Sequence, residues 1–323
     1  MGISIFEMFL EQYPNNYRSM AFYHKILYHP GCNKLLRTIS KPFVAIIPAK
    51  YHFPVTGIIS LGNAEIPSFK MKTNPTNGVT RILFWKGIEG FEYNAARVFI
   101  KLAKKSSLFF DIGSNIGYYS LLASSLTQKK LRICAFEPMA PIYDFLKQNI
   151  ALNNFENITP CQIALSDSEG EAEFYSISNP KFPDMAQLTG DGGLSLQHSG
   201  SRSRQKFNVK VTTLDLFVNT HYPGQKIDLI KLDTEAHEHF VLKGAEEVLK
   251  THRPIIQCEI IKDMIEREIE AIVSPHNYLF FLTTNEGLKE VKTLSQDKIS
   301  IDFYLVPAEK KHIISEFLIS DNK

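Results

Sequence analysis

The sequence predicts an α/β fold built on a doubly wound, mostly parallel sheet with helices on both faces and an antiparallel terminal edge. Two observations carry this prediction. From Glu92 onward, short apolar runs typical of strands alternate with helical segments, and this alternation is typical of a parallel sheet covered on both sides. Near the end of the chain, two further strand-like runs can close the sheet as an antiparallel edge pair.

The first part of the chain is expected to form an α+β extension that leads onto this sheet. Residues 1–40 have helical character in patches, broken at Pro30-Gly31. Three β-like runs follow, separated by Pro, Gly and Asn: Phe43–Ile47, Gly57–Leu61 and Val79–Phe84. The expected organisation is an N-terminal extension at 1–90, the main domain at 91–310 and a C-terminal tail at 311–323.

The main domain is expected to contain five strand–helix steps and a terminal hairpin. The predicted strands are 108–111, 131–136, 158–164, 227–232 and 254–260, with 278–283 and 301–306 as the edge pair. The predicted helices are 95–105, 115–126, 141–152 and 235–250. A further hairpin is expected near Gly170. The stretch 178–205, rich in Gly, Ser and Asp, is interpreted as a lid or acceptor-binding loop, or as a surface insertion.

Composition and charge narrow the class of protein. The chain has 323 residues, 44% hydrophobic and 22% charged, which is ordinary for a globular protein. Its net charge of +2 gives no overall attraction to nucleic acid or anionic lipid. No apolar run approaches the roughly 20 residues of a membrane span, 1–20 lacks the pattern of a secretory signal, and the four cysteines are scattered. We expect a cytoplasmic protein with reduced thiols, and a homo-oligomer is compatible with the sequence.

The strongest signal of a binding site is the turn after the first predicted strand, Asp111-Ile-Gly-Ser-Asn-Ile-Gly117. In such sheets, ligands bind beyond the carboxyl ends of the strands, where the strand order reverses. Gly113 permits a sharp turn and close approach to a ligand, and Gly117 permits close packing of the next helix. The spacing differs from the G-x-G-x-x-G of dinucleotide binders, and Asp111 would repel a pyrophosphate but suits an ammonium group. The alternative is a structural turn that Asp111 caps.

A second acid, Glu137, ends the second predicted strand about twenty residues past the glycines, the position that binds ribose hydroxyls in related sheets. A carboxylate there can accept hydrogen bonds from both hydroxyls. Taken alone, Glu137 could instead cap the following helix. Because Asp111 and Glu137 bracket one strand–helix unit, together they favour a nucleoside-binding site.

More acidic residues follow the fourth predicted strand. We expect Asp233 at its carboxyl end, with Glu235, His237 and Glu238 opening the next helix. Carboxylates at a helix N-terminus are stabilised by the helix dipole, so capping is an alternative role for Glu235 and Glu238. As a site, this cluster could supply a proton acceptor, for which Asp233 and Glu235 rank above His237. Its oxygens could also hold a divalent cation, although the spacing does not require a metal.

Taken together, these segments resemble the FkbM-type class I methyltransferases over roughly residues 90–260. The matching segments are Asp111–Ser120, Phe136–Pro138, Ala164–Asp167 with Gly170, Val211–Asp215, Ile227–Glu238, Val241–Ala245 and Pro254–Glu259. The resemblance implies a Rossmann-like fold, S-adenosylmethionine as cofactor, and O-methylation, commonly of sugars or secondary metabolites. The residues expected to bind the cofactor are Asp111, Gly113, Asn115, Gly117, Glu137, Ala164 and Asp233, and the expected catalytic residues are Asp233, Glu235 and His237. The chain departs from the family pattern at Ala236, where Gly is usual, and at Ser114, where Ala is common.

The leading hypothesis is therefore an S-adenosylmethionine-dependent O-methyltransferase that acts on a small-molecule or saccharide hydroxyl. An N-methyltransferase for nucleic acid or protein is less favoured, because the chain has no Pro-Pro pair for a planar-amine loop and is nearly neutral. A nicotinamide-dependent oxidoreductase conflicts with the glycine spacing. A degenerate cofactor-binding module without catalysis would rest on Ala236 alone.

Overall fold

The computed structural model describes residues 26–44, 46–47, 52–179, 182, 184–190, 192–194, 204–295 and 300–319. The expected helical patches before residue 26, and much of the stretch 178–205, lie outside the described residues.

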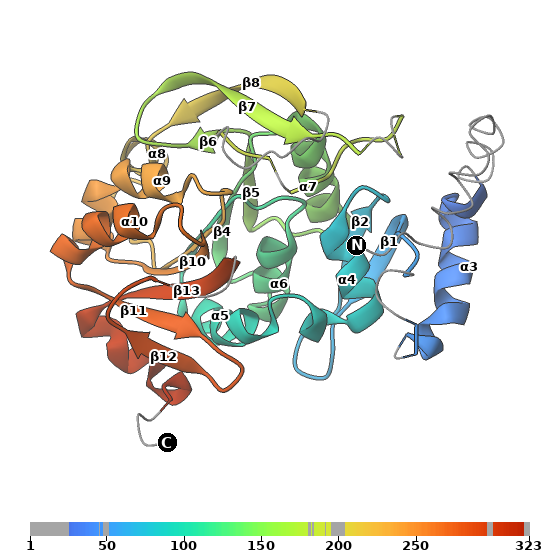
Figure 1. The fold of residues 1–323 in the computed structure, drawn as a ribbon, viewed down its shortest axis with the longest axis horizontal. Coiled ribbons are helices and arrows are strands. Elements are labelled where there is room, and N and C mark those ends of the chain that lie inside the picture. The colour runs from blue at the N-terminus through green and yellow to red at the C-terminus, as the bar shows by residue number, and fades with distance from the viewer. Residues whose placement is uncertain are drawn as a thin grey trace.

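An eight-stranded sheet forms the centre of the fold, with its strands in the order β12-β11-β13-β10-β9-β3-β4-β5 (Figure 1). The parallel strands are β3 (Leu108–Ile112), β4 (Arg132–Phe136), β5 (Ile158–Cys161), β9 (Leu229–Leu232) and β10 (Ile255–Ile261). The antiparallel edge consists of β13 (Ser300–Pro307), β11 (Tyr278–Thr283) and β12 (Leu288–Val291). The chain moves outward from β3 to β5 and then returns to β9 on the other side of β3, so the doubly wound prediction is confirmed.

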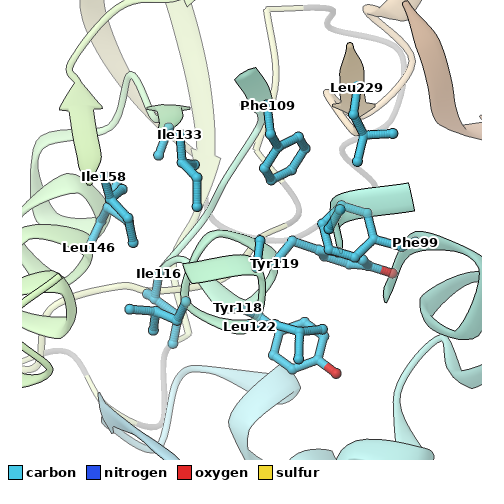
Figure 2. Packing of buried hydrophobic residues seen from close by; sticks show 14 of the residues in the cluster. Phe99, Phe109, Ile116, Tyr118, Tyr119, Leu122, Ile133, Leu146, Ile158 and Leu229 are labelled. Atoms are coloured by element: carbon cyan, nitrogen blue, oxygen red, sulfur yellow. The ribbon is translucent and has the colours of Figure 1, made fainter. Parts of the chain in front are cut away.

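Successive side chains of the parallel strands enter two hydrophobic cores, one on each face of the sheet. Phe109 of β3, Ile133 of β4 and Leu229 of β9 enter the first core and contact the helices on that face (Figure 2). The ring of Phe99 packs edge-on against Phe109, with 5.1 Å between the ring centroids. The helices of this face are α5 (Tyr93–Lys105), α6 (Tyr118–Leu126) and α7 (Ala140–Leu152). The period of two in a strand thus supplies both layers of the fold.

The opposite face carries a second core. Leu108 and Phe110 of β3, the neighbours of Phe109, enter this core. The helices that cover it are α8 (Leu214–His221), α9 (Glu238–Lys243) and α10 (Glu266–Val273). The sequence prediction lacked α8 and α10. It was also wrong about one long helix at 235–250, because α9 begins at Glu238 and a separate π-helical segment covers Val248–His252.

The extension packs against the first face of the main domain, beside α6 and α7 (Figure 1). Its elements are α3 (Pro30–Ser40), β1 (Gly57–Leu61), β2 (Phe69–Thr73) and α4 (Gly78–Lys86). The Asn149 and Asn153 side chains of α7 accept hydrogen bonds from the backbone N–H groups of Lys72 and Lys70, at 2.5 and 2.7 Å. These bonds attach β2, the inner strand of the β1–β2 pair, to the main domain. The domain boundaries at 90 and 310 stay a prediction.

Two of the three β-like runs predicted in the extension were wrong. The run Phe43–Ile47 begins in a 3-10 turn, Lys41–Phe43. The run Val79–Phe84 lies within helix α4, whose N-cap Asn77 accepts a hydrogen bond from the Thr80 N–H at 2.9 Å. A short apolar run is compatible with a buried helix as well as with a strand. Here the N-cap residue Asn77 favours the helix.

The hairpin expected near Gly170 was also wrong. Strand β7 (Gly170–Ile177) pairs antiparallel with the distant β8 (Arg204–Thr212), and β6 (Ala164–Leu165) pairs parallel with β8. The predicted strand 158–164 is therefore split between two sheets. This three-stranded sheet lies above the carboxyl ends of the central strands (Figure 1).

Two bulk properties can be read from the described residues. None of their helices has the length and apolar character needed to cross a bilayer. The four cysteines, Cys32, Cys134, Cys161 and Cys258, form no disulfide in the structure.

Candidate active site

A cavity of about 440 Å³ lies beyond the carboxyl ends of β3, β4 and β9, where the strand order reverses. Its volume is within the range of small-molecule sites. Every residue that the sequence placed in the site lines this cavity except Gly117: Asp111, Gly113, Asn115, Glu137, Ala164, Asp233, Glu235 and His237. The extension also contributes to the wall, through Thr76–Val79. The topology thus gathers residues from distant parts of the chain at one edge of the sheet.

The turn after β3 is held against the end of β9. Gly113 has a φ of 81°, and a Cβ on it would lie 1.7 Å from the carbonyl oxygen of Asp233. Sequence reasoning gave Gly113 a close approach to a ligand, whereas the approach seen here is to the protein's own backbone. Gly117 has a φ of 96°, and a Cβ there would lie 2.7 Å from Leu146 of α7. Gly117 therefore lies behind the cavity wall and permits close helix packing.

Two buried acids stand at the ends of β3 and β4. Asp111 is 1% exposed and its Oδ2 accepts a hydrogen bond from the Ser120 hydroxyl at 2.6 Å. Burial raises the pKa of Asp111 to about 6, although Ser120 and Lys231 oppose the shift. Glu137 is 5% exposed, its Oε1 accepts from the Met139 N–H at 2.8 Å, and burial raises its pKa to about 7. A cation or a hydroxyl donor arriving beside these carboxyls would stabilise their ionised form.

A buried lysine, absent from the sequence-based site, stands beside the cofactor turn. The side chain of Lys231 is 4% exposed, and its Nζ lies 2.8 Å from Asp233 Oδ2 and 4.0 Å from Glu92 Oε2. Glu92 in turn accepts a hydrogen bond from the Tyr119 hydroxyl at 2.6 Å. Burial opposes the charge on Lys231, but the surrounding carboxylates, Asp233 first, raise its pKa well above its ordinary value. Lys231 therefore carries a positive charge in the lining of the cavity.

We call Lys231, Asp233, Glu92, Glu259 and Asp302 the Lys231 cluster, because these four acids all act on the lysine. Burial raises the pKa of Glu92 to about 8 and that of Asp302 to about 7, with Lys231 opposing both shifts. The four acids outnumber the one cation, so the cluster favours a bound proton or an arriving positive group.

The segment after Asp233 forms a turn rather than the start of a helix. Glu235 and Ala236 have φ values of 55° and 63°, two successive left-handed residues. This conformation accounts for the family's preference for Gly at the position of Ala236. Glu238 holds this turn, because its Oε1 accepts hydrogen bonds from the Thr234 N–H and hydroxyl at 2.6 and 3.0 Å, and helix α9 has no side-chain cap at its start.

His237 lies on the side of the cavity formed by β6. Its Nε2 is 2.9 Å from the Ser166 hydroxyl. Burial lowers the pKa of His237 to about 4, so its imidazole is neutral near pH 7. His237 is thus an uncharged hydrogen-bonding group in the cavity wall.

Among the described residues, one group of acids could hold a metal ion: Glu92, Asp233 and Glu259 present oxygens within 4.8 Å of one another. The ammonium of Lys231 already lies 2.8 Å from Asp233 and supplies positive charge at the same place. We therefore assign no metal to this group.

The strand order, in which β13 inserts antiparallel between β10 and β11, the glycine turn after β3 and the acid ending β4 define a class I methyltransferase. The family description "Methyltransferase FkbM domain" matches residues 111–287, more than half of the chain. The chain belongs to the FkbM methyltransferase family and is an S-adenosylmethionine-dependent methyltransferase.

Several proteins with known names are similar to this chain. Methyltransferase sdnD of Sordaria araneosa is 27% identical over 192 residues, which cover 52% of this chain and 72% of that protein. Hexuronic acid methyltransferase AglP of Haloferax volcanii is 25% identical over 209 residues, covering 64% of this chain and 74% of that protein. The solved structure of methyltransferase FkbM from Methylobacillus flagellatus KT is 16% identical, with a TM-score of 0.39, and the alignment covers 62% of this chain and 43% of that one.

The residues present fit S-adenosylmethionine, which carries an ammonium, a sulfonium and a ribose with two hydroxyls. Asp111 and Glu137 offer two buried carboxyls that gain from a cation and from hydroxyl donors. The absence of a Cβ at Gly113 lets the turn after β3 sit against β9. The two acids and the need for glycine at 113 were predicted from the sequence, whereas the packing of Gly113 against β9 and the presence of Glu92 and Lys231 in the cavity were not.

Proposed function

We propose that the chain transfers the methyl group of S-adenosylmethionine to a hydroxyl of a carbohydrate or secondary-metabolite acceptor. The observation that carries this proposal is that Asp111, Glu137 and the members of the Lys231 cluster other than Asp302 line one cavity. A hydroxyl must lose its proton when it is methylated, so carboxylates beside the cofactor residues favour an oxygen acceptor. The name of the haloarchaeal relative, a hexuronic acid methyltransferase, supports a saccharide.

On the cofactor side, Asp111 would hold the ammonium group and Glu137 the ribose hydroxyls. Asn115 and Ala164 would form the adjacent wall, and Gly113 and Gly117 keep the turn and helix α6 in place. When bound, S-adenosylmethionine supplies a methyl group activated by its sulfonium. Each charge-assisted contact of this type contributes about 1.5–3 kcal/mol to binding.

On the acceptor side, Asp233 would orient the acceptor hydroxyl, because it stands at the end of β9 and is fixed by Lys231 at 2.8 Å. Glu235 lines the same cavity and is the second candidate for this role. His237 comes third, since its neutral ring is engaged with Ser166 at 2.9 Å. In-line methyl transfer depends mainly on such alignment.

The test is a transfer assay with methyl-labelled S-adenosylmethionine against a panel of neutral sugars, polyols and matched amines. We expect label in a base-stable ether of a hydroxyl compound. Glu137→Ala should weaken S-adenosylhomocysteine binding at least about tenfold by calorimetry, from the loss of about 1.5 kcal/mol or more. Glu156→Ala, at an exposed acid outside the cavity, is the control. Transfer to amines alone, or equal binding by Glu137→Ala and wild type, would overturn the proposal.

A further inference from the structure

We propose that Glu92, at the start of α5, is the catalytic residue that accepts the proton of the acceptor hydroxyl, held in place by Tyr119 and Lys231. This inference rests on the proposed O-methyl transfer and adds to it. Glu92 precedes the segment matched by the family description, residues 111–287.

The conformation of Glu92 directs its side chain to the cavity. Glu92 is the N-cap of α5, yet its side chain makes no capping hydrogen bond to that helix. Its backbone is left-handed, with a φ of 43°, which is uncommon for a glutamate. The carboxyl instead lines the cavity and its Oε2 accepts from the Tyr119 hydroxyl at 2.6 Å. Among the described residues, its Oε1 has no hydrogen-bond partner, so that oxygen is available to an acceptor.

Asp233 and Glu92 both lie near the ammonium of Lys231, but Asp233 is closer. Asp233 accepts a charge-assisted hydrogen bond from the ammonium at 2.8 Å, and taking up a proton would break this buried ion pair. Glu92 lies farther from the same ammonium, at 4.0 Å, and can become neutral while Lys231 keeps its partner. The geometry therefore separates two tasks: Asp233 would hold the acceptor through a hydroxyl next to the reacting one, and Glu92 would take the proton of the reacting hydroxyl.

The charges around Glu92 suit this role. The ionisable groups that face it are Tyr118 and Tyr119 of α6, Lys231 of β9, Asp233 just after β9, Glu259 of β10, and Asp302 and Tyr304 of β13. Burial outweighs the attraction of Lys231 and raises the pKa of Glu92 to about 8. A carboxylate with a pKa near the working pH is a stronger base than an ordinary one and still releases its proton readily.

The step balances in atoms and charge. The acceptor oxygen bonds to the methyl carbon as the carbon–sulfur bond breaks and the electron pair of that bond removes the sulfonium charge. The hydroxyl proton passes to Glu92, which becomes neutral and later returns the proton to solvent. One positive and one negative charge disappear together, so the buried site ends the step without an unpaired charge.

The decisive comparison uses Glu92→Gln, which keeps the shape of the side chain but cannot take the proton. We expect kcat to fall by about 10²-fold or more, the range of general-base catalysis, while S-adenosylhomocysteine affinity stays within about twofold. Glu89→Gln is the matched control, because Glu89 is exposed and only three residues away. A direct reading comes from carbon-13 NMR of labelled glutamate carboxyls, in which a resonance titrating near pH 8 should vanish in Glu92→Gln.

Tyr119→Phe tests the positioning role. The Tyr119 hydrogen bond lowers the pKa of Glu92, so its loss should move the rise of kcat with pH to higher pH. Glu92→Asp keeps a carboxyl group, so its kcat should be lower than that of wild type but should still rise with pH. This variant tests the role of Glu92 if Glu92→Gln does not fold. If wild type methylates a hydroxyl and Glu92→Gln does so at the same rate, or Glu92→Asp loses the rise, this inference fails alone. If wild type methylates no hydroxyl, the proposed function fails first.

Discussion

The carbonyl oxygen of Asp233 occupies the place where a side chain on Gly113 would have to stand, only 1.7 Å from an ideal Cβ. The Asp233 N–H also donates to the Ile112 carbonyl at 3.0 Å. The turn expected to hold the cofactor and the acid expected to orient the acceptor are therefore one unit. Any shift of one moves the other, which ties cofactor binding to acceptor alignment.

Gly113→Ala should lower both stability and cofactor affinity. A left-handed φ of 81° costs an alanine roughly 1–2 kcal/mol, and the new methyl would clash with backbone rather than a flexible side chain. We expect a fall in Tm of several degrees and at least a tenfold loss of S-adenosylhomocysteine affinity by calorimetry. Gly78→Ala is the control, since it lines the same cavity but has no atom within 4 Å of its ideal Cβ. Wild-type affinity in Gly113→Ala would contradict this account.

The sequence predicted those site residues that stand at the ends of strands, but not those that reach the site through tertiary packing. Asp111 and Glu137 were predictable, because acids at the ends of neighbouring parallel strands meet at one edge of the sheet. Lys231 sits inside an apolar run, and its direction becomes clear only from its register opposite Asp111 in β3. Glu92 carried no signal, because its left-handed backbone and its contact with Tyr119 come from tertiary packing.

The same distinction holds for the fold. The helices α5 and α7 and most parallel strands agreed with apolar periodicity and boundary residues. The run Val79–Phe84 did not, because its apolar pattern fits both a strand and a buried helix. Strand β8 pairs with β7 across a long connection, a contact that no local pattern specifies.

Stability should fall as pH rises from about 6.5 to 8.5. Burial raises the pKa of five carboxyls: Asp111 to about 6, Glu137, Glu238 and Asp302 to about 7, and Glu92 to about 8. Unfolded carboxyls titrate near pH 4, so over this interval the folded chain binds more protons than the unfolded chain. The stability that these groups provide below pH 4 is lost as pH passes their folded pKa values.

Thermal unfolding in matched buffers checks this. His237, whose pKa burial lowers to about 4, opposes the trend only near pH 6.5, because the unfolded imidazole also becomes neutral as the pH rises above that value. Glu92→Gln should flatten the curve above about pH 7.5, because it removes the carboxyl that titrates last. A Tm that rises across the interval would show that these acids are ionised in the folded protein.

Replacing Ala236 by the family's usual Gly should change little. Glycine removes the strain of a left-handed φ of 63°, which stabilises the fold by roughly 1 kcal/mol. It also removes the methyl group of a residue that is 2% exposed, which costs about 0.8 kcal/mol, and it raises the conformational entropy of the unfolded chain, which is a further cost. We expect the free energy of unfolding by urea to stay within about 1 kcal/mol, with unchanged kcat. Ala236→Val, branched at Cβ, should destabilise by more than about 2 kcal/mol. A large gain of activity in Ala236→Gly would mean that alanine distorts the active turn.

The charge of the cavity should select against acidic acceptors. The described lining includes six acids, namely Glu92, Asp111, Glu137, Asp233, Glu235 and Glu259, against one Lys or Arg, Lys231, which is paired with Asp233 at 2.8 Å. A carboxylate on the acceptor would lie among these acids, and facing those that are ionised would cost several kcal/mol before screening. The name of AglP therefore supports a saccharide acceptor for this chain but not an acidic one.

A methyl glucoside, the matching glucuronide and glucosamine form a test set that varies charge at nearly constant shape. We expect kcat/KM for the glucuronide to be at least about tenfold below that of the neutral sugar, equivalent to about 1.4 kcal/mol, and the amino sugar to match or exceed the neutral one. Glu259→Gln should narrow the gap, because it removes a cavity charge, whereas Glu268→Gln, at an exposed acid of α10, should not. Raised salt should narrow the gap only slightly, since buried charges are poorly screened. Preference for the glucuronide would mean that Lys231 leaves Asp233 to bind the acceptor carboxylate.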